Sequence, residues 1–248
     1  MNTFEKPADL DDYRRSHLDR GANYDASICA SPFDAYMAAW ERRHIPRIVG
    51  KLFPRGLDRY LDFACGTGRI TEQIAPLARQ ATAVDISPTM IAEARRKCPA
   101  TRFHLGDLTT TDPELGRFDL VSSFRFLGNA QDELRRAALG AIAKRVVPGG
   151  YLLVNNHRNP RALYALLGRL AGGESGQMDL DLPKLRALLG DFGFDIVHMQ
   201  PIGVWMHRAR TMVSARADDE RSVRNERRFG SPNFAHIAPD LIVAARKR

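Results

Sequence analysis

The sequence predicts an α/β fold with a doubly wound, mostly parallel sheet. From about Arg59 onward, short apolar runs of strand length alternate with segments of helical periodicity. The first run leads into a Gly-x-Gly turn within LDFACGTGRI, residues 61–70. Alternation of this kind favours a parallel sheet with helices on both faces, and a glycine turn between strand and helix is typical of sheets that bind nucleotide-like ligands.

Seven runs have the length and composition of strands. They cover residues 60–65, 82–86, 102–105, 118–124, 151–155, 194–199 and 240–245. Helical periodicity covers residues 70–79, 88–97, 131–146 and 182–189. The second of these helices has a clear start, because Ser87 is an N-cap residue and Pro88 suits the first helical position.

Two segments lie outside this alternation. The N-terminal segment has helical periodicity around residues 35–49 and no strand pattern, so we expect a helical cap or lid. A long insertion separates the last two strands, and insertions of that length in a compact domain are usually functional lids. The expected domains are therefore a cap over 1–58, a core over 59–200, the insertion over 201–237 and a final core strand over 238–248.

Four large side chains in these two segments carry different expectations. Tyr36 and Trp40 are four residues apart and share a helix face, which is more typical of core packing than of a substrate stack. Trp205 and Met206 lie in the insertion, where a lid, a lipid-facing surface and a dimer interface are all open to them. The oligomeric state cannot be derived from the pattern.

Composition excludes several classes of protein. The 248 residues suffice for one large domain with a proper core. The 3 cysteines, Cys29, Cys65 and Cys98, are widely spaced and form no CxxC pair, which argues against disulfides or a zinc site and favours a reducing compartment. No apolar run approaches the roughly 18–20 residues of a membrane span, and the polar N-terminus has no signal-peptide pattern. We therefore expect a cytoplasmic protein.

The net charge of +8 raises the question of a nucleic-acid partner. The basic residues are mostly scattered arginines, and the one dense region, residues 208–228, also holds four acidic residues. A mixed, charged helix face is the simplest interpretation, and a patch that attracts an anionic substrate is the alternative.

Two acidic residues at the ends of the second and third strands narrow the choice of ligand. Asp85 comes 17 residues after Gly68, close to the spacing of about 20 at which a carboxylate binds ribose hydroxyls. Asp107 ends the third strand, where it can accept a hydrogen bond from an adenine amine. Thr71 stands where a dinucleotide fingerprint needs a third glycine or alanine, so the pattern favours an adenosine ligand without a pyrophosphate.

In this order, LDFACGTGR, AVDIS, GDL, FDLVSSF and VPGGYLLV resemble the motif series of class I S-adenosylmethionine-dependent methyltransferases. The resemblance covers roughly residues 59–200 and the final strand. It implies S-adenosylmethionine as cofactor, S-adenosylhomocysteine as product, and a seven-stranded Rossmann-like sheet whose last strand is antiparallel. Ala64 stands where the commonest form of the turn has its first glycine.

The resemblance also implies a set of cofactor-binding residues. Asp62 would support the turn and the methionine amino group, Asp85 would hold the ribose hydroxyls and Asp107 would take the adenine amine. The remaining positions would line the methionine, ribose or adenine, flank the sulfonium or close over the cofactor: Ala64, Gly66, Gly68, Ile86, Met90, Leu108, Phe124 and, from the N-terminal segment, Tyr24.

Two residues are candidates for the methyl-transfer chemistry. Arg125 leaves the fourth strand beside the methyl donor and can hold an anionic group of the substrate; a solvated arginine or one paired with Asp132 is equally compatible with the sequence. His157 follows the fifth strand in the polar run NNHRNP and is the best candidate base, although such a run also satisfies turn backbone groups. His104 and His198 lie in strand patterns and are expected to be structural.

The acceptor is less well defined. The chain has SFRF where adenine-N6 methylases carry their Asn/Asp-Pro-Pro-Tyr/Phe tetrad, and no Pro-Cys pair follows that strand. We therefore expect a small-molecule acceptor, such as a natural product or sugar derivative, methylated on oxygen or nitrogen without a metal. Two alternatives stay open: an RNA or tRNA methyltransferase that uses the basic insertion, and a non-catalytic regulatory protein that binds the cofactor.

Overall fold

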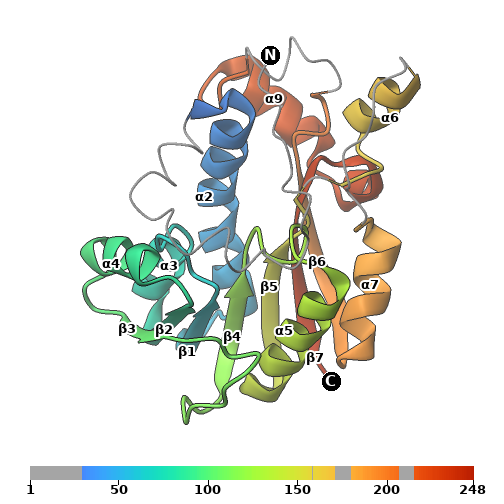
Figure 1. Cartoon of the computed structure of the whole chain (residues 1–248). Coiled ribbons are helices and arrows are strands. Elements are labelled where there is room, and N and C mark those ends of the chain that lie inside the picture. Colours follow the sequence, from blue (N-terminus) through green and yellow to red (C-terminus); the bar gives the residue numbers. More distant parts are fainter. Residues whose placement is uncertain (1–29, 158, 171–179, 207–214) are drawn as a thin grey trace.

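The computed structural model describes residues 30–157, 159–170, 180–206 and 215–248. Its centre is a seven-stranded sheet of order β3-β2-β1-β4-β5-β7-β6 (Figure 1). The strands are β1 Leu57–Phe63, β2 Ala78–Asp85, β3 Arg102–Leu105, β4 Phe118–Ser123, β5 Val146–Asn155, β6 Phe194–Ile202 and β7 Asp240–Lys247. Strands β1 to β5 pair in parallel, and β7 is antiparallel to both β5 and β6. The predicted fold class is therefore confirmed.

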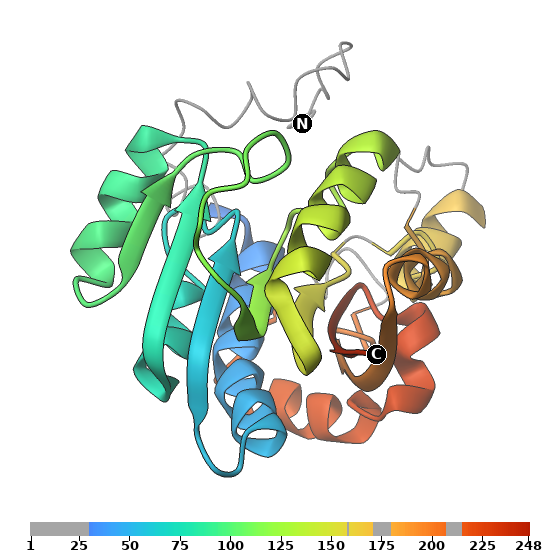
Figure 2. The ribbon, with the colours of Figure 1, turned by 90° about the horizontal axis from the view of Figure 1, so that it is seen from below.

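Helices cover both faces of the sheet. They are α2 Pro32–Leu52, α3 Thr71–Ile74, α4 Pro88–Lys97, α5 Asp132–Arg145, α6 Leu163–Leu170, α7 Leu182–Asp191 and α9 Glu220–Phe229, with 3₁₀ turns η3 Ala75–Leu77 and η4 Pro232–Ile237. Seen from below, α5 and α7 lie on one face and α2 and α9 on the other (Figure 2). Because the strand order reverses at β1 and β4, the carboxyl ends of these strands open a crevice at the switch point.

Several boundaries differ from the predicted elements, and the largest differences have local reasons. The helix expected over 70–79 ends at Ile74, because Pro76 has no N–H to continue it, and β2 begins already at Ala78. Strand β1 begins at Leu57, inside the segment expected to hold no strand. Strand β5 begins at Val146, five residues before the predicted start. Gly149, with a φ of 78°, lies where the pairing with β4 shifts register, so the strand continues through an irregularity instead of starting after a turn.

The described part of the insertion packs into the core on the α2 face of the sheet. Trp205 and Met206 are buried there with Tyr36 and Trp40, so the core role expected of Tyr36 and Trp40 is confirmed. None of the three surface roles left open for Trp205 and Met206 agrees with this burial. The lid role of the insertion stays a prediction, because residues 207–214 lie outside the described residues.

Two further observations concern the classes of protein considered above. Cys65 and Cys98 are buried free thiols, and Cys29 lies outside the described residues. Among the described helices, none combines the length and apolarity that crossing a membrane requires.

Candidate functional site

A cavity opens at the carboxyl edge of the sheet, at the ends of β1, β2, β3 and β4. Ten of the predicted site residues line it: Asp62, Ala64, Gly66, Asp85, Ile86, Met90, Asp107, Leu108, Phe124 and Arg125. Gly68 and His157 do not line it, and Tyr24 lies outside the described residues. Four of the five sequence motifs thus meet around one hollow, and residues 147–154 of the fifth do not line it.

The glycine turn after β1 uses its small residues in different ways. Ala64, Gly66 and Gly68 all have left-handed backbone, with φ values of 56°, 54° and 80°. A Cβ at Gly66 would meet nothing nearer than Met90 Sδ at 4.0 Å, so the glycine leaves space on the cavity side. A Cβ at Gly68 would lie 3.0 Å from the Cβ of Ala94, so this glycine lets α4 approach the turn.

Asp62 lies beneath the turn as a fully buried carboxylate. It accepts hydrogen bonds from Thr71 Oγ1 at 2.6 Å and Ser122 Oγ at 2.7 Å. Burial raises the pKa of Asp62 from its ordinary 3.8 to about 6, against the lowering effect of these bonds. Thr71, which stands in place of a third glycine, therefore holds the carboxylate at the floor of the cavity.

Asp85 joins the end of β2 to the glycine turn. Its Oδ2 accepts from the Gly66 N–H at 2.7 Å and its Oδ1 from the Ser87 N–H at 2.9 Å. Asp107 is oriented by its own loop, because its Oδ1 accepts from both the N–H and the Oγ1 of Thr109. Asp85 ends β2 and Asp107 follows the neighbouring strand β3. Ile86, Met90 and Leu108 add an apolar wall beside the two carboxylates.

Arg125 follows Phe124 at the end of β4 and is held in an uncommon conformation. Its φ is 56°, a left-handed value that costs a non-glycine residue roughly 1–2 kcal/mol. Two asparagine side chains hold this backbone: the Arg125 N–H donates to Asn155 Oδ1 at 2.6 Å, and the Arg125 carbonyl accepts from Asn129 Nδ2 at 2.5 Å. Strain of this kind gathers at functional sites.

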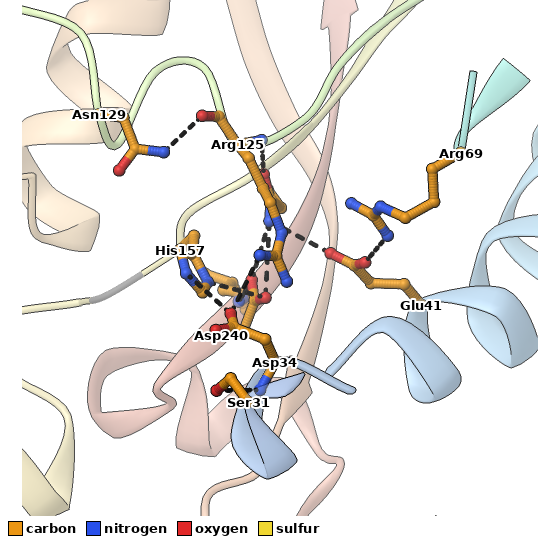
Figure 3. A network of polar contacts seen from close by, with 10 residues as sticks. Ser31, Asp34, Glu41, Arg69, Arg125, Asn129, His157 and Asp240 are labelled. Atoms are coloured by element: carbon orange, nitrogen blue, oxygen red, sulfur yellow. Dashed lines mark hydrogen bonds and ion pairs between the residues drawn. The ribbon is translucent and has the colours of Figure 1, made fainter. Parts of the chain in front are cut away.

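The arginine side chain forms an ion pair with Asp34, the third residue of α2, at 3.0 Å (Figure 3). Asp132, the partner considered from the sequence, pairs with Arg135 instead. The Arg125 side chain therefore points towards α2.

His157 lies behind this pair as a buried residue. Its Nδ1 lies 3.4 Å from Asp240 Oδ2, and its Nε2 lies 3.6 Å from Asp34 Oδ1. His104 and His198 lie within β3 and β6, as expected, and neither lines the cavity. Within the described part of the chain, no group of three or more His, Cys, Asp or Glu could hold a metal ion.

Sequence reasoning missed one pair at this site, Arg69 and Glu41. Arg69 follows Gly68 directly, lines the cavity and pairs with Glu41, whose side chain is fully buried on α2 (Figure 3). The signal was present in the helix: Glu41 falls between Met37 and Ile45 at a spacing of four, on the face that α2 buries. A glutamate at such a position indicates a buried ion pair, because an unpaired charge there costs too much.

Comparison with known proteins agrees with this arrangement. Residues 61–150 match the family model described as a methyltransferase domain, and they span β1 to β5 with the glycine turn, Asp85, Asp107 and Arg125. The chain thus contains a methyltransferase domain.

One curated relative of this chain is the magnesium-protoporphyrin O-methyltransferase of Rhodobacter capsulatus. It is 35% identical over 103 residues, which cover 36% of this chain and 45% of that protein. The ubiquinone biosynthesis O-methyltransferase of Xanthomonas campestris is 31% identical over 115 residues, 44% of this chain and 46% of that protein. The chain thus spans less than half the length of these relatives.

A solved structure extends the likeness over nearly the whole fold. The N-methyltransferase NodS of Bradyrhizobium japonicum, in complex with S-adenosylhomocysteine, has a TM-score of 0.56 at 16% identity and covers 94% of this chain and 95% of its own. At that identity the likeness shows the fold alone.

Proposed function

We propose that this methyltransferase transfers the methyl group of S-adenosylmethionine to an oxygen or nitrogen atom of a small-molecule acceptor, such as a natural product or sugar derivative. The observation that carries the proposal is one cavity with Asp85 and Asp107 along the ends of β2 and β3 and Phe124 and Arg125 at the end of β4. On one side of the cavity, Asp85 and Asp107 provide polar groups for a nucleoside. On the other side, the cavity borders the Arg125 guanidinium, which Asp34 holds in place.

The lining fits the cofactor residue by residue. Asp85 is the last residue of β2, at the end that would face a ribose, and it already accepts a hydrogen bond from the glycine turn. The same carboxylate would therefore bind both the ligand and the turn. Asp107 offers an acceptor for the adenine amine, and Leu108 a backbone N–H for the ring. Ile86 and Met90 provide apolar surface for the two adenine faces.

The methionine part would lie towards β1 and β4. Asp62 would attract the amino group, Ala64 and Gly66 would line the chain, and Phe124 would flank the sulfonium. Gly68 would act through the packing of α4 against the turn. Tyr24 stays our candidate for closure over the cofactor. The cofactor supplies an activated methyl group, so the protein has to align an acceptor atom with it and exclude water.

Arg125 is our candidate for binding an anionic group of the acceptor. It lines the cavity next to Phe124, and a guanidinium matches carboxylate and phosphate groups geometrically. His157 stays our candidate base for an acceptor hydroxyl. Since its Nε2 faces Asp34 behind the cavity wall, a proton from the acceptor would reach it only once the Arg125–Asp34 pair has opened.

The test is calorimetric titration with S-adenosylmethionine and S-adenosylhomocysteine, on wild type and on Asp85→Asn. We expect micromolar dissociation constants, weakened at least tenfold in the variant, because one strong acceptor is lost. Asp58→Asn, at the opposite end of β1 on an exposed side chain, is the matched control and should bind like wild type. Failure of well-folded protein to bind either ligand would contradict the proposal.

A methyl-transfer screen follows, in which release of S-adenosylhomocysteine is measured with small hydroxyl and amine acceptors and with tRNA. Transfer to a small acceptor supports the proposed function. Transfer to tRNA alone would replace it with the nucleic-acid alternative, and tight cofactor binding without turnover of any acceptor would favour the regulatory one.

A further inference from the structure

The cavity wall carries two cations, and each has its own carboxylate on α2. Among the described residues that line the cavity, Arg69 and Arg125 are the cationic ones, and they pair with Glu41 and Asp34 respectively. Arg125 stands beside the acceptor space. Arg69 stands at the glycine turn, next to the part of the cavity that the methionine end of the cofactor would occupy.

The Glu41 carboxylate is fixed through both of its oxygens. Oε2 takes the hydrogen bond from Arg69 Nη1, and Oε1 accepts from Asn155 Nδ2 at 3.2 Å. Asn155 in turn receives the Arg125 N–H on its Oδ1. Because the carboxylate cannot rotate without breaking one of these contacts, it sets the direction in which the Arg69 guanidinium points.

The Arg69–Glu41 pair differs from an ion pair that only joins two elements, because its arginine borders the cavity. The Arg69 side chain is 14% exposed and borders the cavity, while Glu41 is 0% exposed behind it. The Arg69 guanidinium therefore borders the cavity, while its partner Glu41 lies buried behind it. Truncating one partner of such a pair is costly, because the remaining charge stays buried.

The charge of the cofactor matches this placement. Its methionine end carries one carboxylate and one ammonium, and Asp62, the carboxylate at the floor of the cavity, suits the ammonium. The carboxylate needs a cation near the same turn, and a guanidinium offers two parallel hydrogen bonds to it. Arg69 is the cavity cation that belongs to the glycine turn.

We propose that Arg69 binds the methionine carboxylate of the cofactor and that Glu41 of α2 positions Arg69 for it. This inference rests on the proposed function. It makes α2, a helix outside the matched methyltransferase domain, part of the cofactor site. The contact from Glu41 through Asn155 to Arg125 also links the cofactor end of the cavity to the acceptor end.

Two ligands separate this role from a structural one. S-adenosylhomocysteine carries the amino-acid carboxylate, and 5′-methylthioadenosine has the same nucleoside and sulfur without it. In calorimetric titrations, Arg69→Gln should raise the dissociation constant of S-adenosylhomocysteine by about tenfold to a hundredfold, the usual effect of losing a charge-assisted bond. Binding of 5′-methylthioadenosine should change less than twofold.

Glu41→Gln keeps the size of the side chain and one good acceptor, so it tests positioning. We expect S-adenosylhomocysteine to bind several-fold more weakly, with 5′-methylthioadenosine again unchanged. Arg69→Lys keeps the charge without the fork and should fall between wild type and Arg69→Gln. Arg145→Gln is the matched control, because Arg145 is a buried arginine paired with Asp112 away from the cavity; it should alter stability and leave both affinities unchanged.

Each outcome tests one part of the proposal. Equal weakening of both ligands by Arg69→Gln, or no weakening, would overturn the carboxylate role. Unchanged S-adenosylhomocysteine binding by Glu41→Gln would overturn the positioning role. If Arg69→Gln does not fold, Arg69→Lys and Glu41→Gln decide the question, through the ratio of the affinity for S-adenosylhomocysteine to the affinity for 5′-methylthioadenosine. Absence of S-adenosylhomocysteine binding by wild type would instead contradict the proposed function itself.

Discussion

Asp34 and Glu41 lie seven residues apart on α2, and each forms an ion pair with an arginine that lines the cavity. Seven residues are close to two helical turns, so both carboxylates lie on one side of the helix. The N-terminal helix therefore contributes the charged support behind the cavity wall. Four predictions follow from other features of the site and of its surroundings.

Ala64 is a strained position at which a glycine should stabilise the protein. Its φ of 56° costs alanine roughly 1–2 kcal/mol, and glycine loses part of that gain through its more flexible unfolded chain. We expect Ala64→Gly to raise the free energy of unfolding by up to about 1 kcal/mol in urea titrations. Ala143→Gly, in the helix α5, is the control and should lower it by about the same amount. A destabilised Ala64→Gly would contradict the left-handed geometry.

Glu226 should make stability depend on pH. It is buried between α9 and α2, and its Oε1 accepts from Tyr36 Oη, the Gly203 N–H and Trp205 Nε1 at 2.9–3.0 Å. Burial raises the pKa of Glu226 from its ordinary 4.5 to about 7. A raised carboxyl pKa means that the folded state binds the proton more tightly than the unfolded state. The stabilisation is therefore complete below pH 4.5 and is lost as pH rises through 7.

The matching experiment is urea unfolding of wild type and Glu226→Gln from pH 5 to 8. Wild type should lose up to about 3 kcal/mol over this range through Glu226, whereas glutamine accepts the same three bonds without a charge. The difference between the two proteins isolates this residue, because Asp62 titrates in both. Parallel stability curves would show that Glu226 does not titrate in this way.

Asp62 should make cofactor affinity depend on pH in the opposite direction. Burial raises the pKa of Asp62 to about 6, so the carboxylate that would attract the methionine ammonium is lost as pH falls through 6. We expect S-adenosylhomocysteine to bind up to about tenfold more weakly for each pH unit below 6. With 5′-methylthioadenosine, which has no ammonium, affinity should stay level between pH 5 and 7. A similar decline for both ligands would exclude this role of Asp62.

Trp205 should behave as a core residue. It is buried against Tyr36, with the two ring centroids 6.2 Å apart, and donates to Glu226. Trp205→Ala is expected to lower the free energy of unfolding by about 3–5 kcal/mol. Leu170→Ala, at a side chain that is 85% exposed, should change it by less than about 0.5 kcal/mol. A loss for Trp205→Ala as small as that would favour a surface role instead.

The local sequence pattern determined most of the strands and the residues at the carboxyl edge of the sheet. The strand at 102–105 and the helix at 88–97 have the predicted bounds, because length, apolar composition and the Ser87-Pro88 cap act over a few residues. The position of Asp85 and Asp107 at the cavity was predictable for the same reason: Asp85 is the last residue of β2, Asp107 comes two residues after β3, and parallel strands bring their carboxyl ends to one edge.

Only the tertiary structure decided which charges meet. Glu41 and Arg69 are 28 residues apart in the chain, His157 and Asp240 are 83 apart, and Tyr36 and Glu226 are 190 apart. A periodic pattern shows that a side chain is buried or charged, but not its distant partner, because that partner is set by how α2, β7 and α9 pack on the sheet. The same holds for Gly68, whose missing Cβ makes room for Ala94 of α4. The sequence by itself thus determined the fold and the edge of the sheet at which the cavity opens, while packing between distant elements decided the ion pairs behind that edge.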